Sequence, residues 1–341
     1  MQEKQTTQIR LRDYPDGPVQ DQNWTTTHDA PGACAPGQVL VQVQMLSVDP
    51  GMRGWITPKR SYMPPVRPGE VMRAFGVGRV LESMADALKP GDVVTGFTGI
   101  QTMAVLDARH LRKIDLAHAS VREYLGGLGM TGYTAYFGLL DVGKPQPGQT
   151  VVVSAAAGAV GSIVCQIAKI KGCRVVGIAG GPAKTAYLRD SLGLDAVIDY
   201  KDSSQSLDEA LKLAAPGGID LYFDNVGGEV LDAVLMRINR NARVVVCGGI
   251  SQYTSMASMR GPANYLQLVA QSATMQGFTM LDFMGRVPEA FMALRGWSSS
   301  GKLQFRDHVL GGIAAFPKAF NMLFAGENQG KLLIDLEAAG A

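Results

Sequence analysis

A short loop between an apolar segment and a helical segment carries the clearest chemical signal in the sequence. Val151 to Val153 have the composition of a buried strand and run into Ser154-Ala155-Ala156-Ala157-Gly158-Ala159-Val160-Gly161, where a helical pattern begins. This is the order of a dinucleotide-binding loop, with Ala156 in place of the first glycine. Gly158 would let the backbone approach a pyrophosphate, and the helix N-terminus offers N–H groups to the phosphates. The alternative is a plain tight turn.

The end of the next predicted strand, Arg174–Ile178, indicates which dinucleotide would bind. An NAD-selective site places Asp or Glu about 20 residues after the loop, on the ribose 2′-hydroxyl. Here Ala179-Gly180-Gly181 follows the strand, and no acid occurs before Asp190. Lys184 follows instead, and a lysine would attract the 2′-phosphate that an acid would repel. The pattern predicts NADPH, the alternative for Lys184 being a solvated lysine on a helix.

Metal and hydrolase chemistry find no support in the sequence. A catalytic zinc site needs three ligands from Cys, His and Asp or Glu, and a structural site usually needs a cysteine cluster. The four histidines, at 28, 110, 118 and 308, have no cysteine at ligand spacing, and no Gly-x-Ser-x-Gly motif occurs. The sequence therefore predicts no metal site and disfavours both zinc-assisted alcohol oxidation and serine hydrolysis.

Length and composition predict a globular protein of about two domains, because single cores stop growing near 250–300 residues. The chain has 341 residues, 46% of them hydrophobic, and a net charge of +2. This charge balance gives no basis for a nucleic-acid partner or an acidic membrane surface. Glycine accounts for 41 of the 341 residues. This share is well above the usual one of about 7%, and the fold has to explain the surplus.

The cysteines and the N-terminal segment predict a cytoplasmic protein. The four cysteines are scattered with no CxxC pair, as is typical of reduced thiols, and residues 1–24 have no apolar signal-peptide core. The uncharged stretch 145–168 is long enough to span a bilayer. It contains prolines, glycines and a polar run, however, so it predicts a turn, a strand and a helix, with no membrane contact.

The pattern of predicted secondary structure changes near residue 145. Before it, short β-like segments such as Val39–Leu46, Val77–Leu81 and Val93–Phe97 alternate with Pro-Gly turns and predict a β-rich domain. After it, apolar strands alternate with helices, which predicts a doubly wound parallel sheet. The predicted series is strand 174–178, helix 183–192, strand 196–198, helix 207–215, strand 220–223, helix 229–238, strand 243–247, then a helix and strand to Phe278. The last apolar segment, 331–336, could return to the first domain.

Several longer motifs resemble one family across nearly the whole chain. In family order they are residues 47–54 (SVDPGMRG), 129–136 (GMTGYTAY), 155–161, 169–177 (KIKGCRVVG), 222–228 (YFDNVGG), 247–251 (CGGIS) and 326–331 (GENQGK). The sequence resembles the zinc-free medium-chain dehydrogenase/reductases, in the group of prostaglandin, curcumin and plant alkenal double-bond reductases. The resemblance implies an α/β fold: a Rossmann-type doubly wound parallel sheet over residues 126–310, and a β-rich GroES-like catalytic domain from 1–125 with 311–341.

The resemblance also implies a set of NADPH contacts. Asn225 could equally cap the helix that follows it, Tyr200 could be a strand-end aromatic, and Asn328 could be a turn residue. The implied set is Gly158, Ala159, Val160 and Gly161 for the pyrophosphate, Lys184 and Tyr200 for the 2′-phosphate, and Asn225, Cys247, Gly248, Gly249, Ile250, Ser251, Tyr253, Phe278, Thr279, Met280 and Asn328 for the remainder.

The implied activity is the NADPH-dependent reduction of the activated C=C bond of α,β-unsaturated aldehydes and ketones, with hydride delivered to the β-carbon. Negative charge then develops on the carbonyl oxygen, and Tyr253 is the candidate catalytic residue that would donate to this enolate. The alternative for Tyr253 is a lid or packing aromatic. Quinone reduction on the same fold and a non-catalytic NADPH-binding role are the competing functions.

Substrate shape is the least determined part of the prediction. Trp55, Tyr62 and Met130 are candidate walls of the substrate pocket, with first-domain core as the alternative. Relatives often have an aromatic residue where this chain has Gly51, so their substrate shape does not transfer. The resemblance further implies a homodimer with a small-molecule α,β-unsaturated carbonyl substrate.

Overall fold

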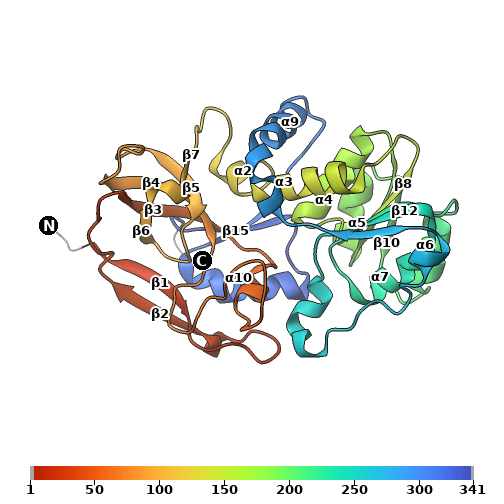
Figure 1. Ribbon diagram of the computed structural model, residues 1–341, viewed down its shortest axis with the longest axis horizontal. Helices are drawn as coiled ribbons and strands as arrows, with labels where there is room; N and C mark the ends of the chain where they lie inside the picture. The colour runs from red at the N-terminus through yellow and green to blue at the C-terminus, as the bar shows by residue number, and fades with distance from the viewer. Residues whose placement is uncertain (1–3, 339–341) are drawn as a thin grey trace. The chain divides into compact units, whose positions relative to one another are not determined.

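The structure, a computed structural model, describes residues 4–338, except for the side chains of 255–258. Contacts between Cα atoms divide the chain into two compact units (Figure 1). The first contains the residues up to Gly126 together with those from Asp307 onward, and the second is Gly127–Arg306. The predicted combination of a parallel α/β sheet with a separate β-rich domain is confirmed.

The first unit is built mainly from antiparallel strands. Its large sheet has the order β14-β15-β3-β4-β5-β7, β6 pairs with β3, and β1 and β2 form a separate antiparallel pair. These strands are β1 (Thr6–Leu11), β2 (Trp24–Asp29), β3 (Gln38–Ser47), β4 (Phe75–Ser83), β5 (Val93–Phe97), β6 (Met103–Asp107), β7 (Arg112–Lys113), β14 (Asp307–Gly311) and β15 (Lys331–Asp335); the helices are α1 (Met52–Trp55), α2 (Val121–Leu125) and α10 (Phe316–Ala325).

The chain's last strand closes the large sheet of the first unit. β15 pairs antiparallel with β3, with Leu333 opposite Ser47, so the C-terminal segment lies beside the loop that leads into α1. Helix α10 packs its apolar face against the strands: Phe316 and Phe320 are fully buried and meet the ring of Trp24 edge-on, at centroid distances of 5.1 and 5.9 Å. Apolar burial of this kind is the main source of stability in such a core.

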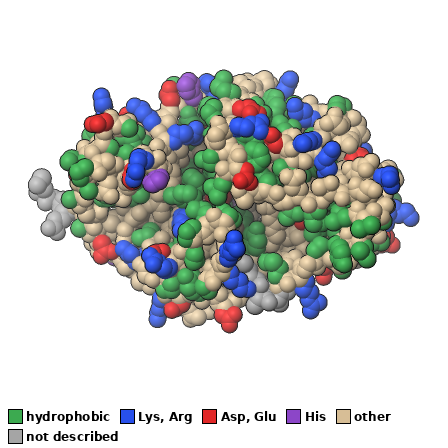
Figure 2. Space-filling model, viewed as in Figure 1, with side chains coloured by type: hydrophobic (Ala, Val, Ile, Leu, Met, Phe, Trp, Pro, Cys, Tyr) green, Lys and Arg blue, Asp and Glu red, His purple; other side chains and the backbone are tan. Residues whose placement is uncertain are grey.

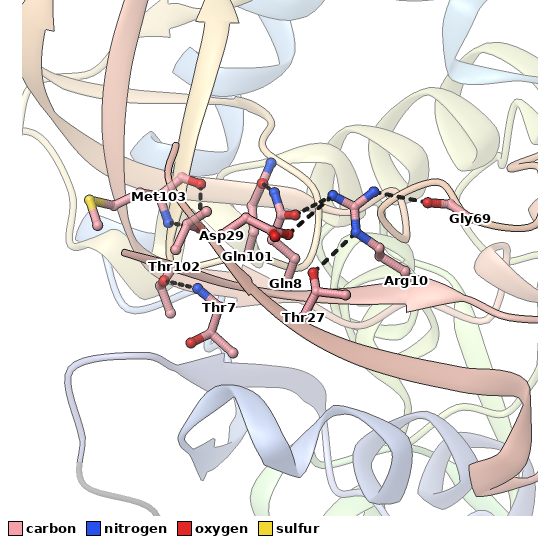
Figure 3. A network of polar contacts seen from close by, with 10 residues as sticks. Thr7, Gln8, Arg10, Thr27, Asp29, Gly69, Gln101, Thr102 and Met103 are labelled. Atoms are coloured by element: carbon pink, nitrogen blue, oxygen red, sulfur yellow. Dashed lines mark hydrogen bonds and ion pairs between the residues drawn. The ribbon is translucent and has the colours of Figure 1, made fainter. Parts of the chain in front are cut away.

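A polar network around Arg10 fixes the segment that precedes β4 (Figure 3). The Arg10 guanidinium donates to the carbonyl of Gly69 at 2.9 Å and to the Thr27 hydroxyl at 3.2 Å. The backbone of β1 also bonds to this segment: the N–H of Met72 donates to the carbonyl of Ile9 at 2.9 Å. Residues 69–72 are therefore held on one side by β1.

The second unit contains a six-stranded parallel sheet of order β10-β9-β8-β11-β12-β13. Its first strand, β8, lies near the centre, so the strand order reverses at β8 and β11, where such sheets bind ligands. The strands are β8 (Thr150–Ser154), β9 (Arg174–Ala179), β10 (Ala196–Asp199), β11 (Ile219–Asp224), β12 (Ile238–Val246) and β13 (Thr274–Gly277); the helices are α3 (Met130–Phe137), α4 (Ala159–Ile170), α5 (Pro182–Ala186), α6 (Leu207–Ala214), α7 (Gly228–Leu235), α8 (Gln267–Ala270) and α9 (Val287–Ser299).

Both faces of this sheet are covered, which explains the near-continuous apolar strands. Val152, Tyr222 and Val244 belong to one buried cluster with residues of α6 and α7. Their neighbours along the strands point to the opposite face, where α3 and α4 pack against each other and α3 packs against α9. All five residues of β8 are buried.

One predicted element is wrong at its end, and one helix is not predicted from the sequence. Ile238 was expected at the end of a helix but begins β12, where it pairs with Ile219 of β11. Helix α9, residues 287–299, had not been expected, because its pattern of apolar and polar residues is weak. The uncharged stretch 145–168 forms a turn, β8 and α4, as predicted.

The described part of the chain has no helix long and apolar enough to cross a bilayer. On the face shown in Figure 2, basic and acidic side chains are interspersed, and no large region of one sign is seen. Both observations agree with the balanced composition of the sequence.

A buried lysine fixes the loop between β3 and α1. Lys331 is 3% exposed, and its Nζ donates to a carboxylate oxygen of Asp49 at 2.5 Å and to the carbonyl of Val48 at 3.1 Å. The Ser47 hydroxyl donates to the other oxygen of Asp49. Because a buried ammonium is costly without partners, this pair fixes β15 relative to the loop.

Replacing this lysine tests the pair. We expect Lys331→Met to lower the free energy of unfolding by about 1–3 kcal/mol, since Asp49 loses its partner but is partly solvated, its side chain being 34% exposed. Chemical denaturation of the variant measures the effect. Lys318→Met, at an exposed position of α10, is the control and should change stability little; equal stability of the two variants would show that the pair is not stabilising.

Candidate active site

The predicted dinucleotide loop has a backbone geometry that requires its second glycine. After β8 the chain turns at Ala155, which has a positive φ of 47°, and the Ala155 carbonyl accepts the N–H of Gly158 at 2.8 Å. A Cβ at Gly161 would lie 2.3 Å from that same carbonyl oxygen. Only glycine therefore lets α4 pack this closely against the loop.

The N-terminus of α4 fits a phosphate group. Gly158 is the N-cap residue, and no side chain caps the helix. The first N–H groups of an α-helix have no partner within the helix, so those of Ala159, Val160 and Gly161 can bind an anion. The residues predicted to hold the pyrophosphate thus lie together with the required donors; their contact with the cofactor stays a prediction.

The structure brings Lys184 and Tyr200 to the same end of the sheet, after β9 and β10. The ring of Tyr200 lies against Gly180, where a Cβ would be 2.7 Å from the ring, and 52% of Tyr200 is exposed. The carboxylate of Asp199 accepts the N–H of Gly181 at 2.9 Å and joins these two loops. A strand-end packing role and a phosphate-binding role for Tyr200 are compatible here.

Lys201 is a second cation at this point, which the sequence reasoning missed. The pKa of Lys184 is lowered, first by burial and then by the positive charge of Lys201. Two ammonium groups that repel each other in this way would be relieved by a dianion such as a 2′-phosphate. The position of Lys201 directly after Tyr200 was the available signal.

The buried carboxylate of Asp224 organises the carboxyl ends of three strands. Its Oδ1 accepts from the backbone N–H of Val226 at 3.0 Å and of Gly227 at 2.9 Å. It also accepts from the hydroxyls of Tyr222 at 2.8 Å and Ser154 at 3.2 Å. Asp224 is 1% exposed, and burial raises its pKa while these donors lower it. Asp224 belongs to the motif at residues 222–228, whose sequence alone does not indicate this role.

Asn225 connects this turn to the dinucleotide loop. Its side-chain amide donates to the carbonyl of Ser154 at 2.7 Å, and its backbone N–H donates to the Ser154 hydroxyl at 2.9 Å. Helix α7 begins with Gly227 as N-cap and has no side-chain cap, so the alternative that Asn225 caps this helix is wrong. Asn225 therefore fixes the position of β8 relative to β11 at the predicted cofactor site.

The loop after β12 carries the candidate catalytic residue. The backbone carbonyl of Asp224 accepts the N–H groups of Cys247 and Gly248 at 2.9 and 3.1 Å, which holds the loop beside β11. The phenol oxygen of Tyr253 accepts the N–H of Gly249 at 3.2 Å and would lie 3.1 Å from a Cβ at Gly248. Tyr253 thus packs directly on the Gly248-Gly249 backbone.

The remaining residues of this loop are also placed by backbone bonds. The N–H groups of Ile250 and Ser251 donate to the carbonyls of Asn225 and Val226, both at 3.2 Å. Burial, with a smaller effect of the Asp224 charge, raises the pKa of Cys247 to about 12, so its thiol stays protonated at neutral pH and is a poor nucleophile. Cys247 can line the site without reacting with an electrophilic substrate.

Four other predicted residues of the second unit lie outside these loops: three follow β13, and one begins α3. Phe278, the residue after β13, packs against Gly138, where a Cβ would be 2.4 Å from its ring. Thr279 is the N-cap of the short helix that contains the buried Met280. Met130 begins α3 and is partly exposed. The structure gives these residues positions but no polar contact that would identify a ligand.

The predicted residues of the first unit divide into buried and exposed ones. Trp55 is 6% exposed and belongs to the core of that unit, which is the alternative to a pocket wall predicted for it. Tyr62 is 54% exposed, and its hydroxyl accepts from the Trp55 indole N–H at 3.1 Å. The amide of Asn328 donates to the carbonyl of Gly330 at 2.9 Å, which is a turn contact.

Comparison with known proteins identifies the family. Residues 7–114 match the family model described as N-terminal domain of oxidoreductase, and residues 159–295 match the model described as Zinc-binding dehydrogenase. Despite the second name, no group of three His, Cys, Asp or Glu side chains that could hold a metal ion occurs within the described residues.

Close relatives cover almost the full length of the chain. A putative NADP-dependent oxidoreductase, YfmJ of Bacillus subtilis, is 45% identical over 96% of both chains. The NADPH-dependent curcumin reductase of Escherichia coli is 39% identical over 95% of both. The crystal structure of CurA from Vibrio vulnificus in complex with NADPH superimposes with a TM-score of 0.91 at 38% identity, covering 98% of this chain and all of that one. The chain therefore belongs to the medium-chain dehydrogenase/reductase family, in the NADPH-dependent group that includes the curcumin, prostaglandin and 2-alkenal reductases.

Proposed function

We propose that this protein uses NADPH to reduce the activated C=C bond of α,β-unsaturated aldehydes and ketones. The observation that carries the proposal is the position of Tyr253, whose phenol lies on the Gly248-Gly249 backbone at the carboxyl end of the sheet. The named activities of the relatives, curcumin and 2-alkenal reduction, support the same substrate class.

Three loops of the second unit would hold the cofactor. The N–H groups at the start of α4 suit the pyrophosphate, and Lys184, Tyr200 and Lys201 suit the 2′-phosphate. The loops around Asn225 and Gly248, which Asp224 fixes, would accommodate the nicotinamide end. NADPH bound there would supply a hydride to the β-carbon of the substrate.

Tyr253 would stabilise the charge that develops on the substrate. When the β-carbon gains hydride, the carbonyl oxygen becomes an enolate oxygen, and a phenol hydrogen bond to it lowers the barrier. The Gly249 N–H that Tyr253 accepts makes its phenol a better donor, because hydrogen bonds in a chain polarise one another. The α-carbon then takes a proton, from Tyr253 directly or through water.

A substrate panel tests the proposed function. Purified protein should oxidise NADPH with 2-alkenals and enones, and the products should be saturated aldehydes and ketones. Formation of allylic alcohols would show carbonyl reduction instead. Turnover of quinones but not of enones would make the protein a quinone reductase, and NADPH binding without any turnover would indicate a non-catalytic role.

Replacing Lys184 tests the 2′-phosphate site. We expect Lys184→Ala to raise the KM for NADPH by about 10-fold or more, since one charge-assisted contact is lost, and to leave the KM for NADH nearly unchanged. Steady-state kinetics with both cofactors measure this difference. Lys212→Ala, at an exposed position of α6, is the matched control; an equal effect on both cofactors would remove Lys184 from this site.

Replacing Tyr253 tests the enolate donor. We expect Tyr253→Phe to lower kcat by about 100-fold, the loss typical of one oxyanion donor, while the KM for NADPH changes little. Tyr187→Phe, at a tyrosine of the same unit outside the proposed site, serves as the control. An unchanged kcat would assign Tyr253 a packing role only.

We also propose that two copies of the chain associate through the edge of the parallel sheet. Among the described strands, β13 pairs only with β12, which leaves its other edge open. Exposed apolar side chains precede this edge: Tyr265 is 56%, Leu266 62% and Val269 76% exposed. Open edge strands and apolar patches favour association with another chain.

Measurement of molar mass in solution tests the association. The wild type should be a dimer, and Val269→Glu should shift the mass to that of a monomer because a charge enters the apolar contact. Leu213→Glu, an equally exposed apolar position on α6, should remain dimeric. A monomeric wild type, or a dimeric Val269→Glu, would contradict the proposed surface.

A further inference from the structure

The strand order of the parallel sheet determines which part of a dinucleotide would lie where along its carboxyl edge. The phosphate-binding start of α4 follows β8, and Lys184 and Tyr200, which suit the 2′-phosphate, follow β9 and β10. The strands β11, β12 and β13 lie on the other side of β8. A dinucleotide bound across this edge would therefore place its nicotinamide half beside the residues that follow these three strands.

The connection from β13 to α9 begins at this part of the edge. Val246 of β12 lies opposite Gly277 of β13, so the chain leaves the sheet beside Cys247, the first residue of the loop after β12. The short 3₁₀ helix Met280–Arg286 follows and leads into α9. Residues 278–286 thus form a strap that starts at the proposed nicotinamide end of the cofactor and ends at α9.

The strap buries little apolar surface of its own. Met280 is buried, but Leu281 and Met284 are 56% and 50% exposed. The ring of Phe283 stacks on that of Phe137 in α3, with 4.7 Å between the ring centroids. A segment with little buried apolar surface opens easily unless other contacts hold it.

Arg286 connects the far end of the strap to α3 and α9. Its Nε and Nη2 donate to the two carboxylate oxygens of Glu289 at 2.9 and 2.8 Å, and its Nη1 donates to the carboxylate of Asp141. Asp141 lies 145 residues earlier, in the helical turn Gly138–Gly143 that continues α3. The Cζ atom of Arg286 also lies 5.1 Å from the centre of the Phe137 ring. One side chain therefore holds three elements together.

This network is stronger than an ordinary surface ion pair. Isolated exposed pairs contribute little, whereas bidentate pairs and networks contribute more. The pair of Arg286 with Glu289 is bidentate, and the Tyr136 hydroxyl donates to the same carboxylate at 3.0 Å. Burial, and then the hydrogen bond to Glu289, raise the pKa of Tyr136 to about 12, so this donor keeps its proton at neutral pH.

We propose that Arg286 is a positioning residue for the nicotinamide end of NADPH. By holding the strap against α3, it keeps Phe278, Thr279 and Met280 in place beside the loop after β12. The inference rests on the proposed function, in which these residues line the cofactor site. The effect of Arg286 is indirect, because it acts through the strap and not through a contact with the substrate.

Calorimetric binding of two nucleotides to the full-length protein, with no enone present, tests this role. NADPH spans the whole site, whereas adenosine 2′,5′-bisphosphate lacks the nicotinamide half. We expect Arg286→Gln to raise the Kd of NADPH about fivefold and to leave the Kd of the bisphosphate nearly unchanged. Asp141→Asn should have a selective effect of the same kind. The double variant should bind NADPH no more weakly than Arg286→Gln, because both changes break one contact.

Arg237→Gln is the matched control for this test. Arg237 forms a bidentate pair with Asp208 at 2.9 and 2.6 Å, and it precedes the amino end of β12, away from the proposed cofactor site. Its replacement should leave the ratio of the two Kd values unchanged. Binding of the bisphosphate shows that a variant is folded; if Arg286→Gln does not fold, Asp141→Asn carries the same test.

Two results would overturn the positioning role. One is an equal increase of both Kd values in Arg286→Gln, which would indicate a general loss of structure. The other is no change in either Kd value. A failure to reduce enones would instead concern the proposed function alone, because the binding measurement contains no enone.

Discussion

The carboxyl end of the parallel sheet in the second unit depends on one buried carboxylate. Asp224 receives two backbone N–H groups of its own turn and two hydroxyls through one oxygen, and its carbonyl receives two N–H groups of the loop after β12. Through Ser154 the same network reaches the dinucleotide loop. The buried carboxylate is tolerated because four donors bond to its Oδ1. The three loops at the switch point of the sheet are consequently fixed relative to one another.

Backbone groups, rather than charged side chains, form most of the proposed cofactor site. Glycine is needed at Gly161, where the backbone of α4 approaches the Ala155 carbonyl, and Gly248 lies directly against the Tyr253 phenol. Part of the glycine surplus in the composition is thereby explained. Charged residues make up only 18% of the chain, which agrees with central strands that are covered on both faces. The charged side chains of the proposed site, Lys184 and Lys201, lie where the 2′-phosphate of the cofactor is predicted to bind.

Strands, helices and loops that are contiguous in the sequence could be predicted from it, whereas contacts between distant residues could not. The strand, glycine loop and helix from Val151 to Lys171 are contiguous, and their pattern defines both the sheet and the nucleotide loop. The bond from Asn225 to Ser154 joins residues 71 positions apart, and that from Lys331 to Asp49 joins residues 282 positions apart. Nothing in either local sequence specifies its partner. Ile238 was misassigned for the same reason, because strand pairing, not local propensity, places it in β12.

The position of the transferred hydrogen tests directly whether this protein reduces a C=C bond with NADPH. The measurement is the reaction of an enone with NADPH deuterated at the transferable position, followed by NMR of the product. Hydride transfer to the C=C bond predicts deuterium at the β-carbon of a saturated ketone. Deuterium at the former carbonyl carbon of an alcohol would contradict it.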